Sequence, residues 1–281
     1  MSDFRTLVDG LTFTECPRWR DGRLWLSDFY THSVLAVDPS GGTERMAEVA
    51  AQPSGLGWLP DGRLLIVSMK DRRILRLEDG GGLVEHADLT GLAPWHLNDM
   101  VVDATGRAYV GNFGFDLMAG GEARTTNLIR VDPDGSATVV ADDLVFPNGM
   151  VITPDGSTLI VAESFANRLT AFTVGPDGGL GDRREWAPLS GVAPDGICLD
   201  AEGAVWVADA LTPRLLRVGE GGTVLEERTT PTPVFACMLG GADGRTLFVS
   251  AAATFAEHEA STTRQAAVLM AEVDVPHAGL P

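Results

Sequence analysis

The chain has 281 residues, of which 44% are hydrophobic, enough for a sizeable core. Its formal net charge of −18 disfavours nucleic acid and anionic membranes as partners, because binding to either depends on cationic side chains. No apolar stretch approaches the roughly 20 residues of a membrane span, the N-terminus lacks a signal-peptide pattern, and the three cysteines lack CxxC spacing. We therefore expect a soluble, cytoplasmic protein that acts on a small molecule.

The predicted elements are short strands separated by glycine turns. Residues 55–59, 63–68, 71–77 and 82–87 form one such group, with a turn at 60–62. Its third strand alternates apolar and polar residues, and similar third strands recur at 33–38, 127–132 and 214–218. No stretch shows a sustained helical period, so the chain is expected to be all-β.

The group repeats six times along the chain. The turn glycines are Gly22, Gly62, Gly106, Gly156, Gly203 and Gly244, and their separations of 40, 44, 50, 47 and 41 residues are typical of four-stranded propeller blades. The last repeat has three strands, at 235–240, 246–250 and 267–275, whereas residues 4–9 look like a fourth strand without its first three. We therefore predict one six-bladed β-propeller domain over residues 1–281, closed by the N-terminal strand completing the last blade.

One column of the repeat carries polar side chains. It lies eight residues before each turn glycine, or seven in the first repeat, and reads Glu15, Ser54, Asn98, Asn148, Asp195 and Ala236. Two carboxylates and two carboxamides at equivalent positions of a cyclic repeat would converge on one axis, where their oxygens suit a hard divalent cation. Any one of these residues could be a polar turn residue entering a strand, but four in register favour a metal site.

The strand order also predicts what surrounds this site. The ends of the second strands share a rim with the column, and these are Asp28, Phe29, Asn112, Phe113, Glu163, Asp209 and Ala251. Two long connections on the same face, residues 111–126 and 251–265, are candidate lids. Four protein oxygens would leave about two or three positions of the ion open, which favours catalysis over a structural role.

Four stretches carry a resemblance to a known family. Residues 15–19 (ECPRW), 97–99 (LND), 147–150 (PNGM) and 194–200 (PDGICLD) resemble the senescence-marker-protein/gluconolactonase/regucalcin family over essentially the whole chain. The resemblance implies a six-bladed propeller that binds one divalent metal ion and hydrolyses lactones or related esters. Calcium is the first expectation for that ion, with zinc, manganese or magnesium as alternatives.

The resemblance also implies roles for individual residues. The metal ligands would be Glu15, Asn98, Asn148 and Asp195, and Asp195 would also be the general base or a proton shuttle. The expected substrate-binding residues are His96, Asn98, Asn112, Phe113 and Asp116. His96 replaces an arginine, and Asp116 a glutamate, of the family's sugar lactonases, and nearby aromatic residues suggest a ligand less polar than a sugar.

Three alternatives to lactone hydrolysis stay open. Diisopropylfluorophosphatase has a similar ligand set on a similar propeller, so a phosphotriesterase is one of them. A non-catalytic, calcium- or ligand-binding propeller of the regucalcin type is the second. A scaffold for protein partners, in which the polar column is incidental, is the third.

Overall fold

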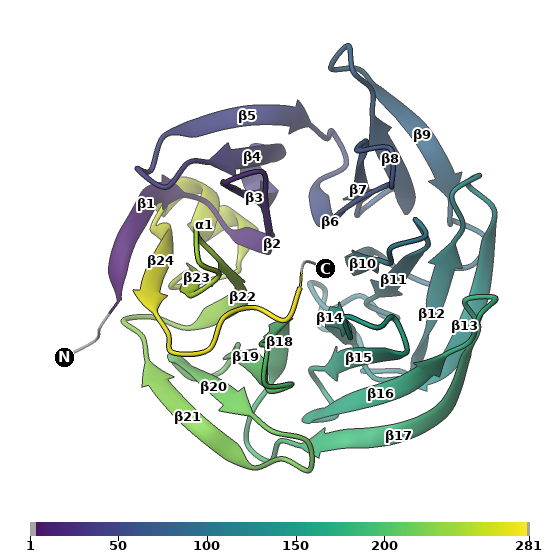
Figure 1. Ribbon diagram of the computed structural model, residues 1–281. Coiled ribbons are helices and arrows are strands. Elements are labelled where there is room, and N and C mark those ends of the chain that lie inside the picture. The colour runs from purple at the N-terminus through teal and green to yellow at the C-terminus, as the bar shows by residue number, and fades with distance from the viewer. Residues whose placement is uncertain (1–3, 280–281) are drawn as a thin grey trace.

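The computed structural model describes residues 4–279 as a ring of six four-stranded antiparallel sheets around a central axis (Figure 1). Blade 1 contains β2 (Thr14–Arg20), β3 (Arg23–Asp28), β4 (Ser33–Val37) and β5 (Thr43–Glu48). Blade 2 contains β6 (Pro53–Trp58), β7 (Leu64–Ser68), β8 (Arg73–Leu77) and β9 (Leu83–Asp88). Blade 3 contains β10 (Leu97–Val102), β11 (Ala108–Asn112), β12 (Thr126–Val131) and β13 (Ala137–Leu144).

The second half of the chain repeats this arrangement. Blade 4 contains β14 (Pro147–Ile152), β15 (Thr158–Glu163), β16 (Arg168–Val174) and β17 (Leu180–Pro188). Blade 5 contains β18 (Pro194–Leu199), β19 (Val205–Asp209), β20 (Arg214–Val218) and β21 (Val224–Thr229). Blade 6 contains β22 (Val234–Gly240), β23 (Thr246–Ala251), β24 (Ala266–Glu272) and the N-terminal β1 (Arg5–Leu11).

The N-terminal strand closes the ring, as the sequence predicts. β1 pairs with β24 antiparallel, with Thr6 opposite Leu269 and Leu11 opposite Ala266, so the first and last parts of the chain lie side by side (Figure 1). The inner strands of neighbouring blades pack against one another, including β2 against β22 across the closure. This pairing covers the edge of β24, which would otherwise be open to another chain.

Removing the closing strand should destabilise the whole ring. A chain that begins at Thr12 loses the four paired positions of β1, and at roughly 0.5–1.5 kcal/mol per ladder hydrogen bond the expected cost is about 2–6 kcal/mol. Urea unfolding would measure the loss, and light scattering would report association through the uncovered edge of β24. The exposed Arg5→Ala variant, which keeps the strand, should change stability by less than about 0.5 kcal/mol. Equal stability of the truncated and full chains would contradict this account of closure.

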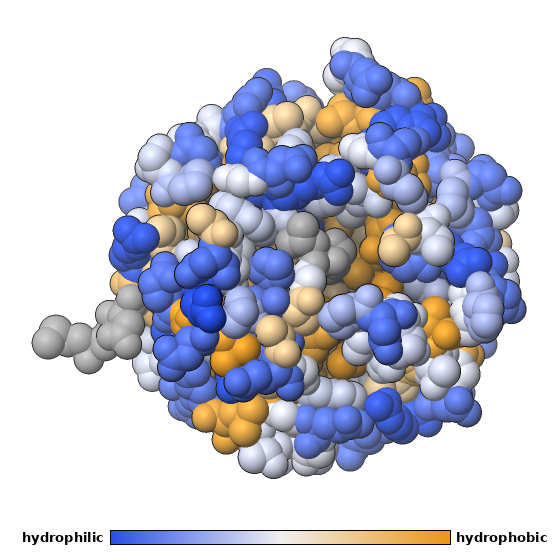
Figure 2. Space-filling model, viewed as in Figure 1, coloured by the Kyte–Doolittle hydropathy of each residue, from blue (hydrophilic) through white to orange (hydrophobic). Residues whose placement is uncertain are grey.

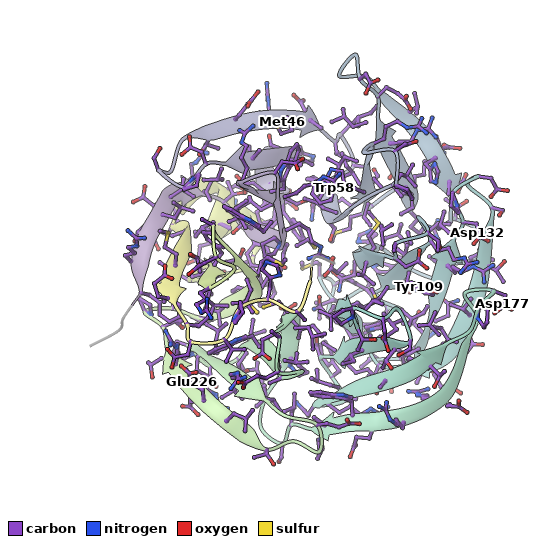
Figure 3. All side chains as sticks on the ribbon, in the orientation of Figure 1. Met46, Trp58, Tyr109, Asp132, Asp177 and Glu226 are labelled. Atoms are coloured by element: carbon purple, nitrogen blue, oxygen red, sulfur yellow. The ribbon has the colours of Figure 1, made fainter. Side chains whose placement is uncertain are left out.

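Aromatic side chains fill the space between blades. Trp25 of β3 meets Trp58 of β6 edge to face, with ring centroids 5.5 Å apart. The fully buried Tyr109 of β11 donates a hydrogen bond from its hydroxyl to the Gly178 carbonyl of the next blade, at 3.0 Å. Trp58 and Tyr109 are labelled among the interior side chains in Figure 3. These contacts hold neighbouring blades in a fixed rotation about the axis.

The segment after β24 crosses the turn face of the ring, toward the axis (Figure 1). The backbone N–H groups of His277 and Ala278 donate to Gly244 and Leu199, at 3.0 Å each. Figure 2 shows the same face, with hydrophilic residues dominating its perimeter. The polar column opens on the opposite face, because each first strand runs from its column residue toward its glycine turn.

Two connections contain short helical segments that the sequence did not predict. A short helix, α1 (Glu257–Thr263), and a 3-10 turn, η1 (Phe29–Thr31), lie in connections where only loops were expected.

Within residues 4–279, no helix has the length and apolarity needed to cross a membrane. Cys16, Cys198 and Cys237 are buried free thiols.

Candidate functional site

The four oxygen-bearing column residues lie around one cavity. Glu15, Asn98, Asn148 and Asp195 all line a cavity of about 410 Å³ at the end of the inner strands opposite the glycine turns. Each of the four is only 7–8% exposed. The remaining column residues, Ser54 and Ala236, are buried and lie outside the lining. Blades 1, 3, 4 and 5 therefore supply polar groups to one place.

A β-bulge lies at or directly after each of these residues. In every blade the register between the first and second strands shifts at the column, for example between Leu97 and Met100 and between Pro194 and Ile197. A bulge leaves residues unpaired and re-aims their side chains, so a strand that would otherwise alternate can turn an oxygen toward the axis. Gly149 permits the tight packing this requires, since a Cβ there would lie 2.6 Å from the Ile197 nitrogen.

Hydrogen bonds fix the two carboxamides. Nδ2 of Asn98 donates to the Pro147 carbonyl at 3.2 Å, and Nδ2 of Asn148 donates to Oγ of Ser164 at 3.2 Å. Ser164 in turn donates to the Pro194 carbonyl at 2.7 Å. Asn98 is thus held by the next blade and Asn148 by its own, and with both amide nitrogens engaged, the amide oxygens are the atoms left to serve a ligand in the cavity.

The ionised forms of the two carboxyl groups, Glu15 and Asp195, are disfavoured in the folded chain. Burial first, and then the negative charges of Asp195 and Asp99, raise the pKa of Glu15 well above its ordinary value. Burial, followed by the charge of Asp99, raises the pKa of Asp195 in the same direction. Oδ1 of Asp195 is buried and has no hydrogen-bond partner among residues 4–279. A cation at this position would supply the missing partner and offset the repulsion.

The residues present fit a divalent ion. Carboxylate and amide oxygens are the donors that calcium, magnesium and manganese prefer, and the unpaired Asp195 oxygen is a buried acceptor of this kind. Within the described part of the chain, no three His, Cys, Asp or Glu side chains gather to hold a metal. Two of the four column residues are asparagines, so this set differs from sites built only of those residue types.

A buried ion pair lies next to the column. Nη2 of Arg18 donates to Oδ1 of Asp99 at 2.9 Å and to the Met100 carbonyl at 2.7 Å. Both side chains of the pair are almost fully buried, at 4% and 6% exposure. Burial lowers the pKa of Arg18, but the charge of Asp99 outweighs it and the pKa ends above its ordinary value. The guanidinium therefore balances one of three buried carboxylates near the axis.

Of the expected substrate-binding residues, Asn98 and Phe113 line the cavity. His96 lies behind Phe113, half-buried and stacked on Trp95, with ring centroids 5.0 Å apart and 6.2 Å from Phe113. Burial lowers the pKa of His96, which favours the neutral imidazole. Asp116 accepts a hydrogen bond from the Ala119 N–H at 3.0 Å. Substrate contact by His96, Asn112 and Asp116, which lie outside the lining, stays a prediction.

Most of the second-strand ends lie outside the cavity and accept hydrogen bonds from loop N–H groups. Asp28, Asn112, Glu163 and Asp209 are fully buried or nearly so and lie outside the cavity lining. Oδ1 of Asp28 accepts from the Phe13 N–H at 3.1 Å, and Oε2 of Glu163 accepts from the Val145 N–H at 2.7 Å. Asp209 and Asn112 likewise accept from loop N–H groups. These side chains hold the loops that carry the cavity wall, and only Phe29 and Phe113 of the expected rim reach the cavity.

Sequence reasoning missed most of the cavity wall. The further apolar side chains that line it are Phe13, Tyr30, Leu117, Met118, Phe146, Phe165, Leu211, Phe235 and Phe255, with small contributions from Ala193 and Ala210. Many stand one or two residues from a column residue or just beyond a second strand. This spacing could have identified the wall residues from the sequence, because residues beside the column and residues just beyond a second strand lie at the same rim.

Both long connections contribute to the cavity mouth. The loop after β11 supplies Leu117 and Met118, and the loop after β23 supplies Phe255. The latter loop is tied to blades 1 and 2, because the Tyr30 hydroxyl donates to the Phe255 carbonyl and Lys70 pairs with Glu257 of α1 at 3.3 Å. Their expected role as lids stays a prediction.

Comparison with known proteins agrees with this architecture. The family model described as "SMP-30/Gluconolactonase/LRE-like region" matches residues 13–253. A 6-deoxy-6-sulfogluconolactonase from Pseudomonas putida is 29% identical over 278 residues, covering 95% of this chain and 93% of the relative. The pentonolactonase XacC of Haloferax volcanii is 28% identical over 278 residues, covering 95% and 92%.

A solved structure of a similar protein has the same fold. The gluconolactonase XC5397 from Xanthomonas campestris superposes with a TM-score of 0.77 and 26% sequence identity, covering 99% of this chain and 89% of that one. The family match, the closed six-bladed ring and the polar column therefore agree. The chain belongs to the SMP-30/gluconolactonase/LRE-like family.

Proposed function

We propose that this protein is a divalent-metal-dependent hydrolase of lactones or related esters. The observation that carries the proposal is the meeting of Glu15, Asn98, Asn148 and Asp195 at one cavity, with the Asp195 carboxylate oxygen buried and unpaired. Relatives named as lactonases, similar over nearly their whole length, support the choice of lactones over phosphotriesters.

Each residue has a proposed part in the reaction. The ion would be held by Glu15, Asn98, Asn148 and Asp195. The bound ion would act as a Lewis acid on the substrate carbonyl and would lower the pKa of a bound water. One carboxylate oxygen of Asp195 would contact the ion, and its other oxygen accepts the proton of the attacking water. Ser164 holds Asn148 in place, and Phe113 packs against the substrate. The wall of aromatic side chains limits competing bulk water.

Metal binding should be visible as added stability. A chelator-treated sample given Ca²⁺ at 100 times its dissociation constant should gain about 2.7 kcal/mol, because the ion binds the folded chain alone. Thermal melting with Ca²⁺, Mn²⁺, Mg²⁺ or Zn²⁺ would rank the ions. The Asp195→Ala variant should lose the shift, whereas Glu48→Gln on the outer strand β5 should keep it. No shift with any of the four ions would refute the metal site.

Activity distinguishes the proposed function from its rivals. We expect hydrolysis of lactones by the metal-loaded chain, loss on chelation and recovery on adding the ion back. A faster rate on an organophosphate panel than on lactones would favour a phosphotriesterase. A metal-induced shift in melting without hydrolysis of any lactone or ester would favour a binding protein.

A further inference from the structure

The mouth of the cavity carries an apolar collar, formed by Met118, Phe165, Leu211 and Phe255. These side chains are 48–71% exposed, and they are four of the seven large hydrophobic side chains that are exposed within residues 4–279. All four line the cavity, and they come from the loops after the second strands of blades 3, 4, 5 and 6. Exposed apolar groups gathered at a concave site mark a surface that a ligand covers.

The collar continues into a packed aromatic wall. Phe165 contacts Phe146 with ring centroids 5.1 Å apart, and Phe146 contacts Phe113 at 4.6 Å. On the other side, Phe255 lies 6.4 Å from Phe235, which meets Phe13 at 4.8 Å. The apolar surface therefore runs unbroken from the exposed mouth to the buried carboxylates. Because the rings hold one another, this surface exists before a ligand arrives.

The wall offers no cation and few free polar groups. Its lining contains no Lys, Arg or His among the described residues, and its only charged members are Glu15 and Asp195. Outside the polar column, the polar side chains of the lining are already engaged. Ser164, Asn167 and Tyr30 donate their hydrogen bonds to the carbonyls of Pro194, Val192 and Phe255. The hydroxyls of a sugar, or a negatively charged substituent, would meet phenylalanine rings and lose hydrogen bonds they make in water.

We propose that the substrate is an uncharged lactone whose ring carries an apolar substituent, an alkyl chain or an aryl group. The inference rests on the proposed hydrolytic function. The carbonyl lies at Glu15, Asn98, Asn148 and Asp195, and the substituent extends along the aromatic wall to the collar. Water adds to the carbonyl carbon, the ring C–O bond breaks, and the departing oxygen takes a proton, giving a hydroxy acid.

The test is a homologous series of γ-lactones on the metal-loaded full chain, from unsubstituted to octyl-substituted, with a polyhydroxylated lactone for comparison. Each methylene that reaches the collar should raise kcat/KM about fourfold. Hydrolysis-resistant γ-alkyl lactams, measured by calorimetry, should bind with the same dependence on chain length. The polyhydroxylated lactone should be a poorer substrate than the hexyl-substituted one.

Collar variants locate the effect. Phe165→Ala combined with Leu211→Ala should flatten the dependence on chain length in both measurements. The matched control is Val224→Ala with Leu225→Ala, on the outer strand β21, where the side chains are 50% and 52% exposed and lie outside the cavity. The control should keep the wild-type dependence, and both doubles should melt as cooperatively as the wild type.

The outcomes separate the two proposals. A flat series in the wild type, or a preference for the polyhydroxylated lactone, would overturn the apolar substrate and leave the lactonase intact. No hydrolysis of any lactone would overturn the hydrolytic function itself. Equal chain-length dependence in the collar and control doubles would show that the collar does not hold the substituent.

Discussion

Asp195→Asn is expected to lower kcat by about 10²–10⁴-fold while leaving the chain folded. The substitution keeps one side-chain oxygen but replaces the other with an NH₂ group, so it removes the negative charge and the basic proton acceptor. The loss of charge should also weaken metal affinity. Steady-state kinetics on a lactone, with the ion titrated to saturation, would separate the two effects.

Stability should move in the opposite direction from activity. Burial raises the pKa of Asp195, so without metal the ionised carboxyl is less favourable in the folded chain than in the unfolded one. The metal-free wild type therefore loses stability as pH rises from about 3.9, the ordinary value, to the raised folded value. Asp195→Asn removes this loss, so the metal-free variant should unfold at an equal or higher urea concentration at pH 7. Full turnover in Asp195→Asn would contradict its role.

Arg18→Met is expected to destabilise the chain by about 3–5 kcal/mol. The variant keeps an apolar stem of similar length but leaves the carboxylate of Asp99 buried without its partner 2.9 Å away. It also removes the donor to the Met100 carbonyl on the inner strand of blade 3. Urea unfolding monitored by tryptophan fluorescence would measure the change.

A second variant and a control identify the cause. Arg18→Met with Asp99→Asn removes both charges, and should recover part of the loss, because an uncompensated buried charge costs more than an absent pair. Arg45→Met breaks an exposed pair with Glu48 on β5 and should cost at most about 1 kcal/mol. Equal effects of Arg18→Met and Arg45→Met would show that the buried pair is not a stabilising element.

The polar column was readable from the sequence because it obeys the repeat. Residues at equivalent positions before the six turn glycines occupy equivalent places in a closed ring once the shorter first turn is allowed for, so the repeat predicts that Glu15 and Asp195 meet near the axis. The bulges that turn these side chains inward were not readable. They depend on pairing with the second strand, which the sequence of the first strand does not encode.

The direction of the side chains at the second-strand ends could not be predicted from the repeat. Their position near the rim was predicted, but Asp28 and Glu163 turn away from the cavity to accept loop N–H groups. Buried backbone donors require partners, and a nearby carboxylate satisfies them before it can serve a ligand. Whether a polar side chain near the rim faces the cavity is therefore decided by its hydrogen bonds to other segments of the chain. For Asp28 and Glu163 these partners lie 15 and 18 residues away.

By itself, the sequence determined the strand order, the six-fold repeat, the closing N-terminal strand and the four polar column residues that meet at the cavity, because each depends on periodicity or on equivalent positions. The tertiary structure alone decided the shape and polarity of the cavity. Its wall includes single side chains, such as Leu117, Met118 and Phe255, from two long loops that follow no repeat. Loop residues are brought together by the packing of neighbouring blades, and that packing is set by contacts distant in sequence.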